Sequence, residues 1–166
     1  LFSIAFLLFF INGGMTGLFL GNASVSMPLS DTLFVVAHFH MVMAVAPVMV
    51  VCGAIYHWYP KISGRWYHEG MARFHFWVTF VGSYAVFLPM HYLGIMGVPR
   101  RYFEITGTTF LPDSAESVNA SITIAALVVG FAQLVFIYNL IVSAFNGKKA
   151  PANPWNATTL EWQTEH

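Results

Sequence analysis

Residues 32–58 decide the fold of this chain. They read TLFVVAHFHMVMAVAPVMVVCGAIYHW and contain no Asp, Glu, Lys or Arg. An apolar run of this length is long enough to cross a bilayer as a helix. Within it, residues 36–42 read VAHFHMV, so two histidines lie one residue apart in a membrane-spanning segment. Ionisable side chains are costly there and usually serve a function.

His38 and His40 are expected to point to nearly opposite faces of this helix, because positions i and i+2 are about 200° apart at roughly 3.6 residues per turn. The pair cannot easily hold one ion together, but it could ligate two different groups, one on each side of the helix. Neutral imidazole is a common ligand of haem iron and of copper. Spacing alone leaves a second interpretation open, in which both histidines only form hydrogen bonds between helices.

The composition indicates a polytopic membrane protein. The 166 residues are 57% hydrophobic and 8% charged, whereas a soluble domain carries about 25% charged residues. The formal net charge is zero, so no nucleic-acid partner is expected. Cys52 is alone in an apolar run, which excludes a disulfide framework and is typical of a packing residue. No charged residues precede the first apolar segment, which does not resemble a signal peptide; we expect a piece of a longer polypeptide or a split subunit.

Four apolar segments predict an all-α fold with four transmembrane helices, at residues 1–20, 32–58, 74–95 and 118–145. Small residues in the first segment, including Gly13 and Gly17, indicate close helix packing. In the second segment, Pro47 is expected to kink the helix and Pro60 to end it.

The basic residues orient the helices. The positive-inside rule places on the cytoplasmic or mitochondrial-matrix side the two connections that carry Lys61, Arg65, Arg73, Lys148 and Lys149. The connections at 21–31 and 96–117 then lie on the opposite side. We therefore divide the chain into a four-helix transmembrane segment, 1–149, and an extended tail on the cytoplasmic or matrix side, 150–166.

A second polar feature lies just outside the third helix, where Arg100 and Arg101 are adjacent. They are on the side nearer the two histidines. Arginine binds carboxylates in a planar, bidentate manner, so the pair is a candidate for holding the carboxylate tails of a cofactor between the helices. The alternative is an anionic lipid headgroup or a salt bridge to Asp31 or Glu104.

The other ionisable residues carry weaker signals. His91 lies on the arginine side and could join that polar cluster. Asp31 could cap the second helix or bind a hard cation at its mouth. Three further histidines are expected to be ordinary residues of the cytoplasmic interface: His57, His68 and His75.

Together these residues resemble the C-terminal third of subunit I of the haem–copper oxygen reductases, of the cytochrome c oxidase type. Residues 29–40, LSDTLFVVAHFH, are similar to the family's HDTYFVVAHFH segment at the start of its tenth helix. Residues 91–102, HYLGIMGVPRRY, are similar to its HFLG…GMPRRY segment. Residues 53–65 and 153–162 are also family-like. The resemblance implies that the four helices are helices nine to twelve of a twelve-helix bundle.

The resemblance also implies a role for each residue of the two motifs. His38 would be the axial ligand of a high-spin haem, where oxygen is reduced opposite a copper. His40 would be one of the two axial ligands of a low-spin haem. Phe39 would lie between the haems, and the haem propionates would be held by Arg100 and Arg101.

Asp31 would help to bind a magnesium or manganese ion near the outer face. The chain departs from the family pattern close to it. Ser30 stands where the family usually has a histidine that shares this ion, and serine is a poorer ligand. Ser26 replaces an aspartate that many members carry near the propionates, and Met41 replaces a common tyrosine.

The implied function is that of part of the catalytic subunit of a terminal oxidase in a respiratory chain. Such an oxidase would transfer electrons from cytochrome c to oxygen, reduce oxygen to water and pump protons. The copper ligands and the second low-spin haem ligand belong to earlier helices of the family, so the isolated fragment is expected to be inactive.

The implied partners are the remainder of subunit I, subunits II and III, cytochrome c and the lipid bilayer. The membrane would be a bacterial or archaeal plasma membrane, or a mitochondrial inner membrane. Two alternatives stay open: a quinol oxidase of the same superfamily, and a non-catalytic membrane subunit descended from such an oxidase.

Overall fold

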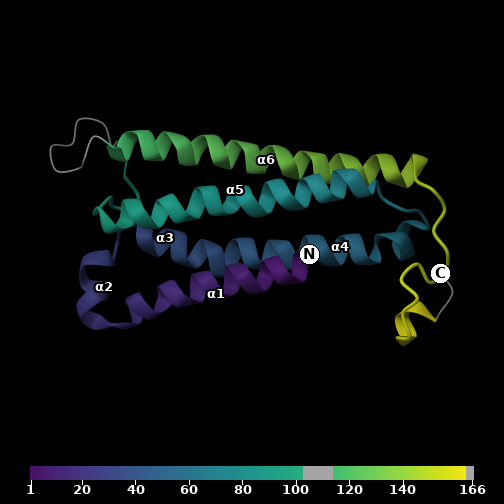
Figure 1. Cartoon of the computed structure of the whole chain (residues 1–166), viewed down its shortest axis with the longest axis horizontal. Helices are drawn as coiled ribbons and strands as arrows, with labels where there is room; N and C mark the ends of the chain where they lie inside the picture. The colour runs from purple at the N-terminus through teal and green to yellow at the C-terminus, as the bar shows by residue number, and fades with distance from the viewer. Residues whose placement is uncertain (103–113, 164–166) are drawn as a thin grey trace.

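A computed structural model describes residues 1–102 and 114–163 of the chain. Its long helices lie side by side in the order α6, α5, α3 with α4, and α1 (Figure 1). The α-helices are α1 (Phe2–Gly21), α2 (Ala23–Leu29), α3 (Leu33–Phe39), α4 (Ala46–Ser63), α5 (Glu69–Ile95) and α6 (Ser114–Asn146). A π-helical turn, His40–Val45, joins α3 to α4, and a 3-10 turn, Leu160–Trp162, lies in the tail.

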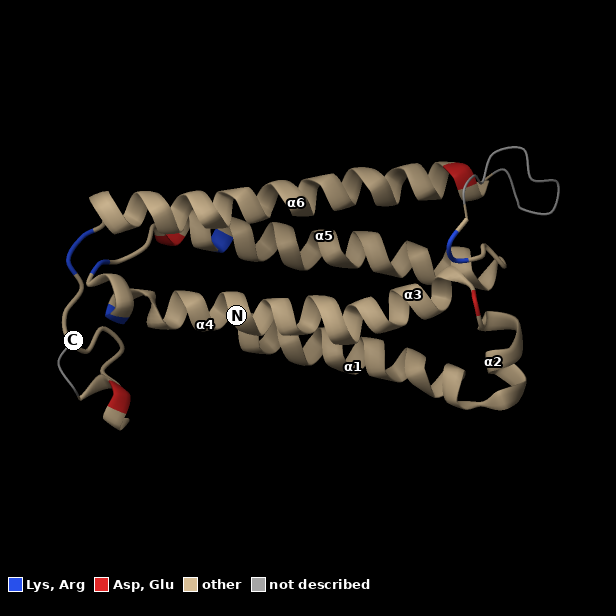
Figure 2. Ribbon diagram, turned by 180° about the vertical axis from the view of Figure 1, so that it is seen from behind, with Lys and Arg blue, Asp and Glu red and all other residues tan. Residues whose placement is uncertain are grey.

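The prediction of four membrane spans is confirmed. Within the described residues, four helical stretches are long and apolar enough to cross a bilayer: Phe2–Gly21, Leu33–Ser63, Glu69–Ile95 and Ser114–Asn146. Charged side chains lie mainly towards the two ends of the bundle and leave its middle apolar (Figure 2). This distribution is the one that a bilayer requires, because water at the two surfaces solvates the charges.

Several boundaries differ from the prediction. The third helix begins at Glu69 instead of residue 74, and the 21–31 connection contains the short helix α2. Pro60 does not end the second span, which continues to Ser63. The helix ends instead at Gly64, whose left-handed φ of 65° is the conformation in which a glycine C-cap terminates a helix.

The distortion expected at Pro47 is a π-helical turn that ends two residues before it. Over His40–Val45 the backbone widens, and the N–H of Ala46 donates to the carbonyl of Met41, five residues back. Proline has no N–H to donate, and its ring crowds the carbonyl four residues earlier in an α-helix. A widened turn immediately before Pro47 relieves that crowding, and π-bulges of this kind are frequent at functional sites.

Two glycines bring α1 close to the second span. A Cβ on Gly13 would lie 2.6 Å from Cγ2 of Val42, and a Cβ on Gly17 would lie 2.9 Å from Cε1 of His38. The close packing predicted from the small residues is therefore confirmed at these two positions. A Cβ added at the neighbouring Gly14 would meet no atom within 4 Å. Only the face of α1 that carries Gly13 and Gly17 therefore packs closely against the second span.

His75, which was expected to be an ordinary residue of the cytoplasmic interface, is completely buried between helices. Its Nδ1 lies 3.3 Å from the hydroxyl of Tyr56 and its Nε2 lies 3.2 Å from Oε1 of Gln133. Gln133 in turn donates to Oγ1 of Thr79 (2.9 Å). These contacts join α4, α5 and α6, and they give each buried polar group a partner in an otherwise apolar interior.

His57 and His68 have structural roles, while their place at the cytoplasmic interface stays a prediction. The ring of His57 stacks on Trp155 of the tail (5.4 Å between centroids), and Trp155 Nε1 donates to the carbonyl of His57 (3.0 Å). Trp162 packs its buried ring edge-on against the same histidine. The tail, expected to be extended, thus contains a 3-10 turn and folds back on α4. His68 caps α5 by accepting from the N–H of Met71 (3.3 Å).

We expect Gly94→Ala to destabilise the bundle. A Cβ on Gly94 would overlap the backbone nitrogen of Phe34, so α5 would have to move away from α3. Overpacking of this kind typically costs about 1–3 kcal/mol, measurable as a lower melting temperature of the purified complex. Gly130→Ala is the matched control, because a Cβ there meets nothing within 4 Å. Equal melting temperatures for the two variants would contradict the close approach of α3 and α5.

Candidate functional site

His38 and His40 contact different neighbouring helices. The His38 ring lies against α1, with its Cε1 atom 2.9 Å from the position that a Cβ on Gly17 would take. The His40 ring stacks on Phe87 of α5, with 5.5 Å between centroids and 19° between planes. The second span therefore lies between α1 and α5 and directs one imidazole towards each, as the spacing of the two residues requires.

The hydrogen bonds of His38 and His40 indicate the same tautomer for both imidazoles. Nδ1 of His38 lies 2.7 Å from the carbonyl oxygen of Gly13, and Nδ1 of His40 lies 2.8 Å from that of Val36. A carbonyl oxygen only accepts, so each Nδ1 carries the ring hydrogen and each Nε2 keeps its lone pair. Such a lone pair is what a metal ligand needs, and a backbone acceptor on Nδ1 is the usual way to orient a ligating histidine.

Each histidine could therefore bind a metal separately. Among the described residues, no three His, Cys, Asp or Glu side chains gather in a way that could hold a metal ion. The two rings are half-buried. Phe39, between them in sequence, is 37% exposed, and its ring centroid lies 4.3 Å from that of His40. An exposed aromatic ring beside two half-buried imidazoles suits contact with a flat apolar group. The chemistry of these residues is compatible with a separate planar cofactor, such as a haem, at each imidazole.

A short antiparallel bridge lies at the end of the bundle where the second span begins. It pairs Thr32 with Pro99, and the N–H of Arg100 donates to the carbonyl of Asp31 (2.8 Å). The side chains of this last pair also meet: Nε of Arg100 donates to Oδ1 of Asp31 (2.8 Å), and a second guanidinium nitrogen contacts the same oxygen. One of the salt bridges considered from sequence is thus present, while Glu104 lies outside the described residues.

Two strained residues flank this bridge. Asp31 has φ 63° and Arg101 has φ 61°, a left-handed conformation that non-glycine residues adopt rarely and that concentrates at functional sites. Tyr102 follows, and its hydroxyl donates to Oδ1 of Asn119 on α6 (3.1 Å). Burial raises the pKa of the Tyr102 hydroxyl, and the hydrogen bond to Asn119 partly opposes that rise. The arginine pair is therefore tied to α3, α5 and α6.

Asp31 does not cap the second span, because the cap is Thr32, whose Oγ1 accepts from the N–H of Phe34 (3.2 Å). Nor do the groups around Asp31 fit a hard cation. Its carboxylate is engaged by Arg100, and the hydroxyl of Ser30 donates to the carbonyl of Ser26 (2.8 Å). A divalent ion would have to displace an arginine, and among the described residues Asp31 belongs to no group of three or more His, Cys, Asp or Glu side chains that could hold it.

His91 is buried. The hydrogen bond and ring contact described for it connect it to Phe87 and Phe34 rather than to the arginines. Its Nδ1 lies 2.7 Å from the carbonyl of Phe87, and its ring meets Phe34 edge-on at 5.0 Å. The same tautomer argument leaves a lone pair on Nε2, which is buried and has no hydrogen-bond partner among the described residues. His91 therefore packs between α5 and α3 beside the candidate site.

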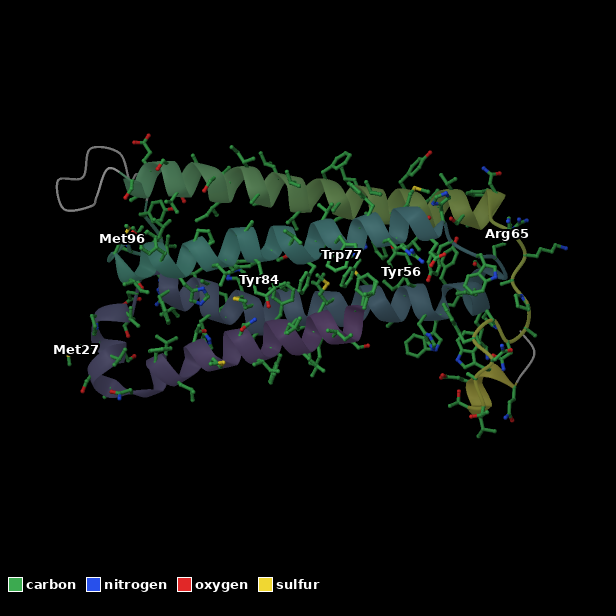
Figure 3. The ribbon with its side chains drawn as sticks, in the orientation of Figure 1. Met27, Tyr56, Arg65, Trp77, Tyr84 and Met96 are labelled. Carbon is green, nitrogen blue, oxygen red and sulfur yellow. The ribbon has the colours of Figure 1, made fainter. Side chains whose placement is uncertain are left out.

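A polar pair that was not expected from the sequence joins α1 to α5. Tyr84 of α5 points towards α1 (Figure 3), where Nδ2 of Asn12 donates to its hydroxyl (2.6 Å). The phenol ring also stacks on buried Phe9 (4.5 Å). Both polar residues border a largely apolar groove of about 770 Å³ between α1 and α5, which Met41 and Thr16 also line. Asn12 stands beside Gly13 in the sequence, but nothing in a single chain indicates that Tyr84 faces it.

Comparison with known proteins gives a consistent result. Residues 1–128 match the protein family described as "Cytochrome C and Quinol oxidase polypeptide I". Over 164 residues, the chain is 64% identical to the alternative cytochrome c oxidase subunit 1 of Bradyrhizobium diazoefficiens and 40% identical to the cytochrome c oxidase subunit 1 of a Synechocystis species. Each alignment covers 99% of this chain but only 28% and 29% of the respective relative.

The fold has a counterpart of known structure. A chain in the cryo-EM structure of a heme-copper terminal oxidase dimer superposes with a TM-score of 0.75 over 89% of this chain and 26% of that chain. The two are 19% identical in sequence, so this likeness concerns the arrangement of the helices. Thus the chain spans less than a third of the length of the proteins it matches.

Proposed function

This chain is an integral membrane protein of the cytochrome c and quinol oxidase polypeptide I family, and from that premise we propose that it forms part of the oxygen-reducing subunit of a terminal oxidase. The observation that carries the proposal is the histidine pair: each Nδ1 donates to a backbone carbonyl, and the rings face different helices. In the whole subunit the four spans would be helices nine to twelve of a twelve-helix bundle.

In this proposal each histidine holds one haem. When bound, the haems supply electron transfer and the reduction of oxygen, together with a copper liganded outside this chain. Nε2 of His38 would hold the iron of the high-spin haem, and Nε2 of His40 would hold the iron of the low-spin haem. Phe39 packs between the haems and keeps water from the space that separates them.

Arg100 and Arg101 hold the haem propionates. A guanidinium has five N–H donors in a fixed fork, so Arg100 can keep its contact with Asp31 and still donate to a propionate. The bridge between Thr32 and Pro99 supports this role, because it holds the arginine segment against the start of the histidine-bearing span. Asp31 then serves as a counter-ion that fixes the arginine rather than as a metal ligand.

Cytochrome c is the proposed electron donor, because the curated relatives cited above are cytochrome c oxidase subunits. The family description also includes quinol oxidases. The whole enzyme would contain subunits II and III and would pump protons. Oxygen consumption by the purified complex should be fast with reduced cytochrome c and slow with a quinol. Faster oxygen consumption with the quinol than with reduced cytochrome c would identify the complex as a quinol oxidase.

Replacing each histidine should remove a different haem signal. For His40→Ala in the full complex we expect loss of the low-spin absorption band in the reduced-minus-oxidised spectrum, because the iron loses one of its two axial ligands. For His38→Ala we expect loss of carbon monoxide binding at the high-spin haem. Each variant is the control for the other, since a general failure to assemble would remove both signals.

Unchanged spectra in both variants would reject the ligand assignment. They would favour the alternative from another functional class, a non-catalytic membrane subunit descended from such an oxidase, in which the two histidines only bond to the carbonyls of Gly13 and Val36.

Arg100→Ala should lower the midpoint potential of the haem whose propionate it contacts. Removing a positive charge near the iron makes the reduced, more negative state less favourable. Arg73→Ala is a matched control, because Arg73 donates to Glu69 (2.6 Å) near the opposite end of α5. A redox titration monitored by absorbance measures both variants. Identical titration curves for Arg100→Ala and the unmodified complex would rule out the propionate contact.

A further inference from the structure

A threonine hydroxyl lies at the point where His38 is anchored. Oγ1 of Thr16 donates to the carbonyl oxygen of Gly13 (2.6 Å), the same oxygen that lies 2.7 Å from Nδ1 of His38. The hydroxyl oxygen is itself 3.0 Å from Nδ1. Three polar atoms from α1 and the second span therefore form one compact triangle behind the imidazole.

The direction of each hydrogen bond in the triangle can be assigned. The Gly13 oxygen has no hydrogen, so at 2.7 Å Nδ1 of His38 must be the donor. The hydroxyl hydrogen of Thr16 then points to the same carbonyl at 2.6 Å, so at 3.0 Å its oxygen can only accept and takes a share of the Nδ1 hydrogen of His38 from the carbonyl. As a result, the Gly13 oxygen accepts from both side chains, and less of its electron density remains for the imidazole hydrogen than if the hydroxyl were absent.

The anchor of His40 is built differently. Its Nδ1 donates to the carbonyl of Val36 at 2.8 Å, one turn back on its own helix. In the described part of the chain, no side-chain hydroxyl bonds to that oxygen. The two imidazoles thus have the same tautomer and similar distances to their acceptors, and they differ in whether a threonine competes for the acceptor.

The His38 ring has little room to escape this arrangement. Gly17, one position beyond Thr16, leaves space for the ring only because it has no Cβ; an added Cβ would lie 2.9 Å from Cε1 and 3.5 Å from Nε2 of His38. With α1 packed this closely, the ring is held beside both the Gly13 carbonyl and the Thr16 hydroxyl. Its Nδ1 must share the Gly13 carbonyl with Thr16.

We propose that Thr16 is a positioning residue that weakens the hydrogen bond from His38 to Gly13 and so limits the electron donation of Nε2 to the haem iron. This inference rests on the proposed function, in which His38 is an axial ligand. A strong hydrogen bond from the non-ligating nitrogen raises the basicity of a ligating histidine. Competition for the acceptor has the opposite effect. At the Gly13 carbonyl the competing donor is a side-chain hydroxyl, whereas at the Val36 carbonyl it is the backbone N–H of His40, which a substitution of a side chain does not remove.

Thr16→Val in the full oxidase complex tests this proposal. Valine keeps the shape of threonine and removes the hydroxyl, so the Gly13 carbonyl becomes fully available to Nδ1 of His38. We expect the iron–histidine stretching frequency of the reduced high-spin haem, measured by resonance Raman spectroscopy, to shift upward. The bond to iron strengthens as the imidazole gains anionic character. Thr16→Ser retains a hydroxyl and should restore the original frequency.

Thr123→Val is the matched control. Thr123 also donates its hydroxyl to a carbonyl of its own helix, that of Asn119 (3.0 Å), but it lies on α6 and bonds to no histidine in the described residues. It should leave the Raman frequency unchanged. If Thr16→Val does not assemble, Thr16→Ala removes the same hydroxyl with less bulk and is expected to give the same upward shift.

The outcomes separate this inference from the proposed function. An unshifted or lowered frequency in Thr16→Val, with carbon monoxide binding intact, would overturn the role of Thr16 and leave His38 as a ligand. An equal shift in Thr16→Ser would do the same, because the hydroxyl would then be irrelevant. Failure of the proposed function would appear instead as normal carbon monoxide binding in His38→Ala.

Discussion

The hydrogen bond from Nδ1 of His38 to the carbonyl of Gly13 is the contact on which the site depends. It crosses between two helices, so it forms only where α1 and the second span are almost in backbone contact. Gly13 and Gly17 allow that approach because they lack side chains. The same contact sets the tautomer of the ring and leaves Nε2 available. Close packing and ligand chemistry therefore have one cause, the small residues of α1.

The histidine pair also depends on a change of helical winding. His40 begins a π-helical turn that ends at Val45, two residues before Pro47. Because the turn is wider than an α-helical one, it changes the rotation of α4 relative to the two imidazoles. His38 lies in α3 and His40 is the first residue of the turn, so both imidazoles come before most of the change in winding, whereas the packing of α4 against α1 comes after it. A proline two residues beyond the turn makes this local structure more favourable than a regular helix.

At the outer end, electrostatics and backbone geometry act together. Asp31 and Arg100 are bonded through both backbone and side chain, and Asp31 and Arg101 adopt left-handed conformations on either side of the bridge. An exposed ion pair contributes little stability alone. Here the Asp31 side chain is 77% exposed, so the pair orients the arginine segment more than it stabilises the bundle. Such an arrangement suits a segment that meets an anionic group.

Periodicity and composition by themselves determined that this chain has four membrane spans, that two imidazoles leave one span in different directions, and that two arginines lie at its outer end. These features are local, since apolar length and helical angle follow from neighbouring residues alone. The tertiary structure decided the rest: Gly13 as the acceptor for His38, the burial of His75 against Gln133, Thr32 rather than Asp31 as the cap, and Arg100 as the partner of Asp31. Each of these four features depends either on residues distant in sequence or on a backbone conformation set by packing. The spacing of residues within one segment indicates neither kind of feature.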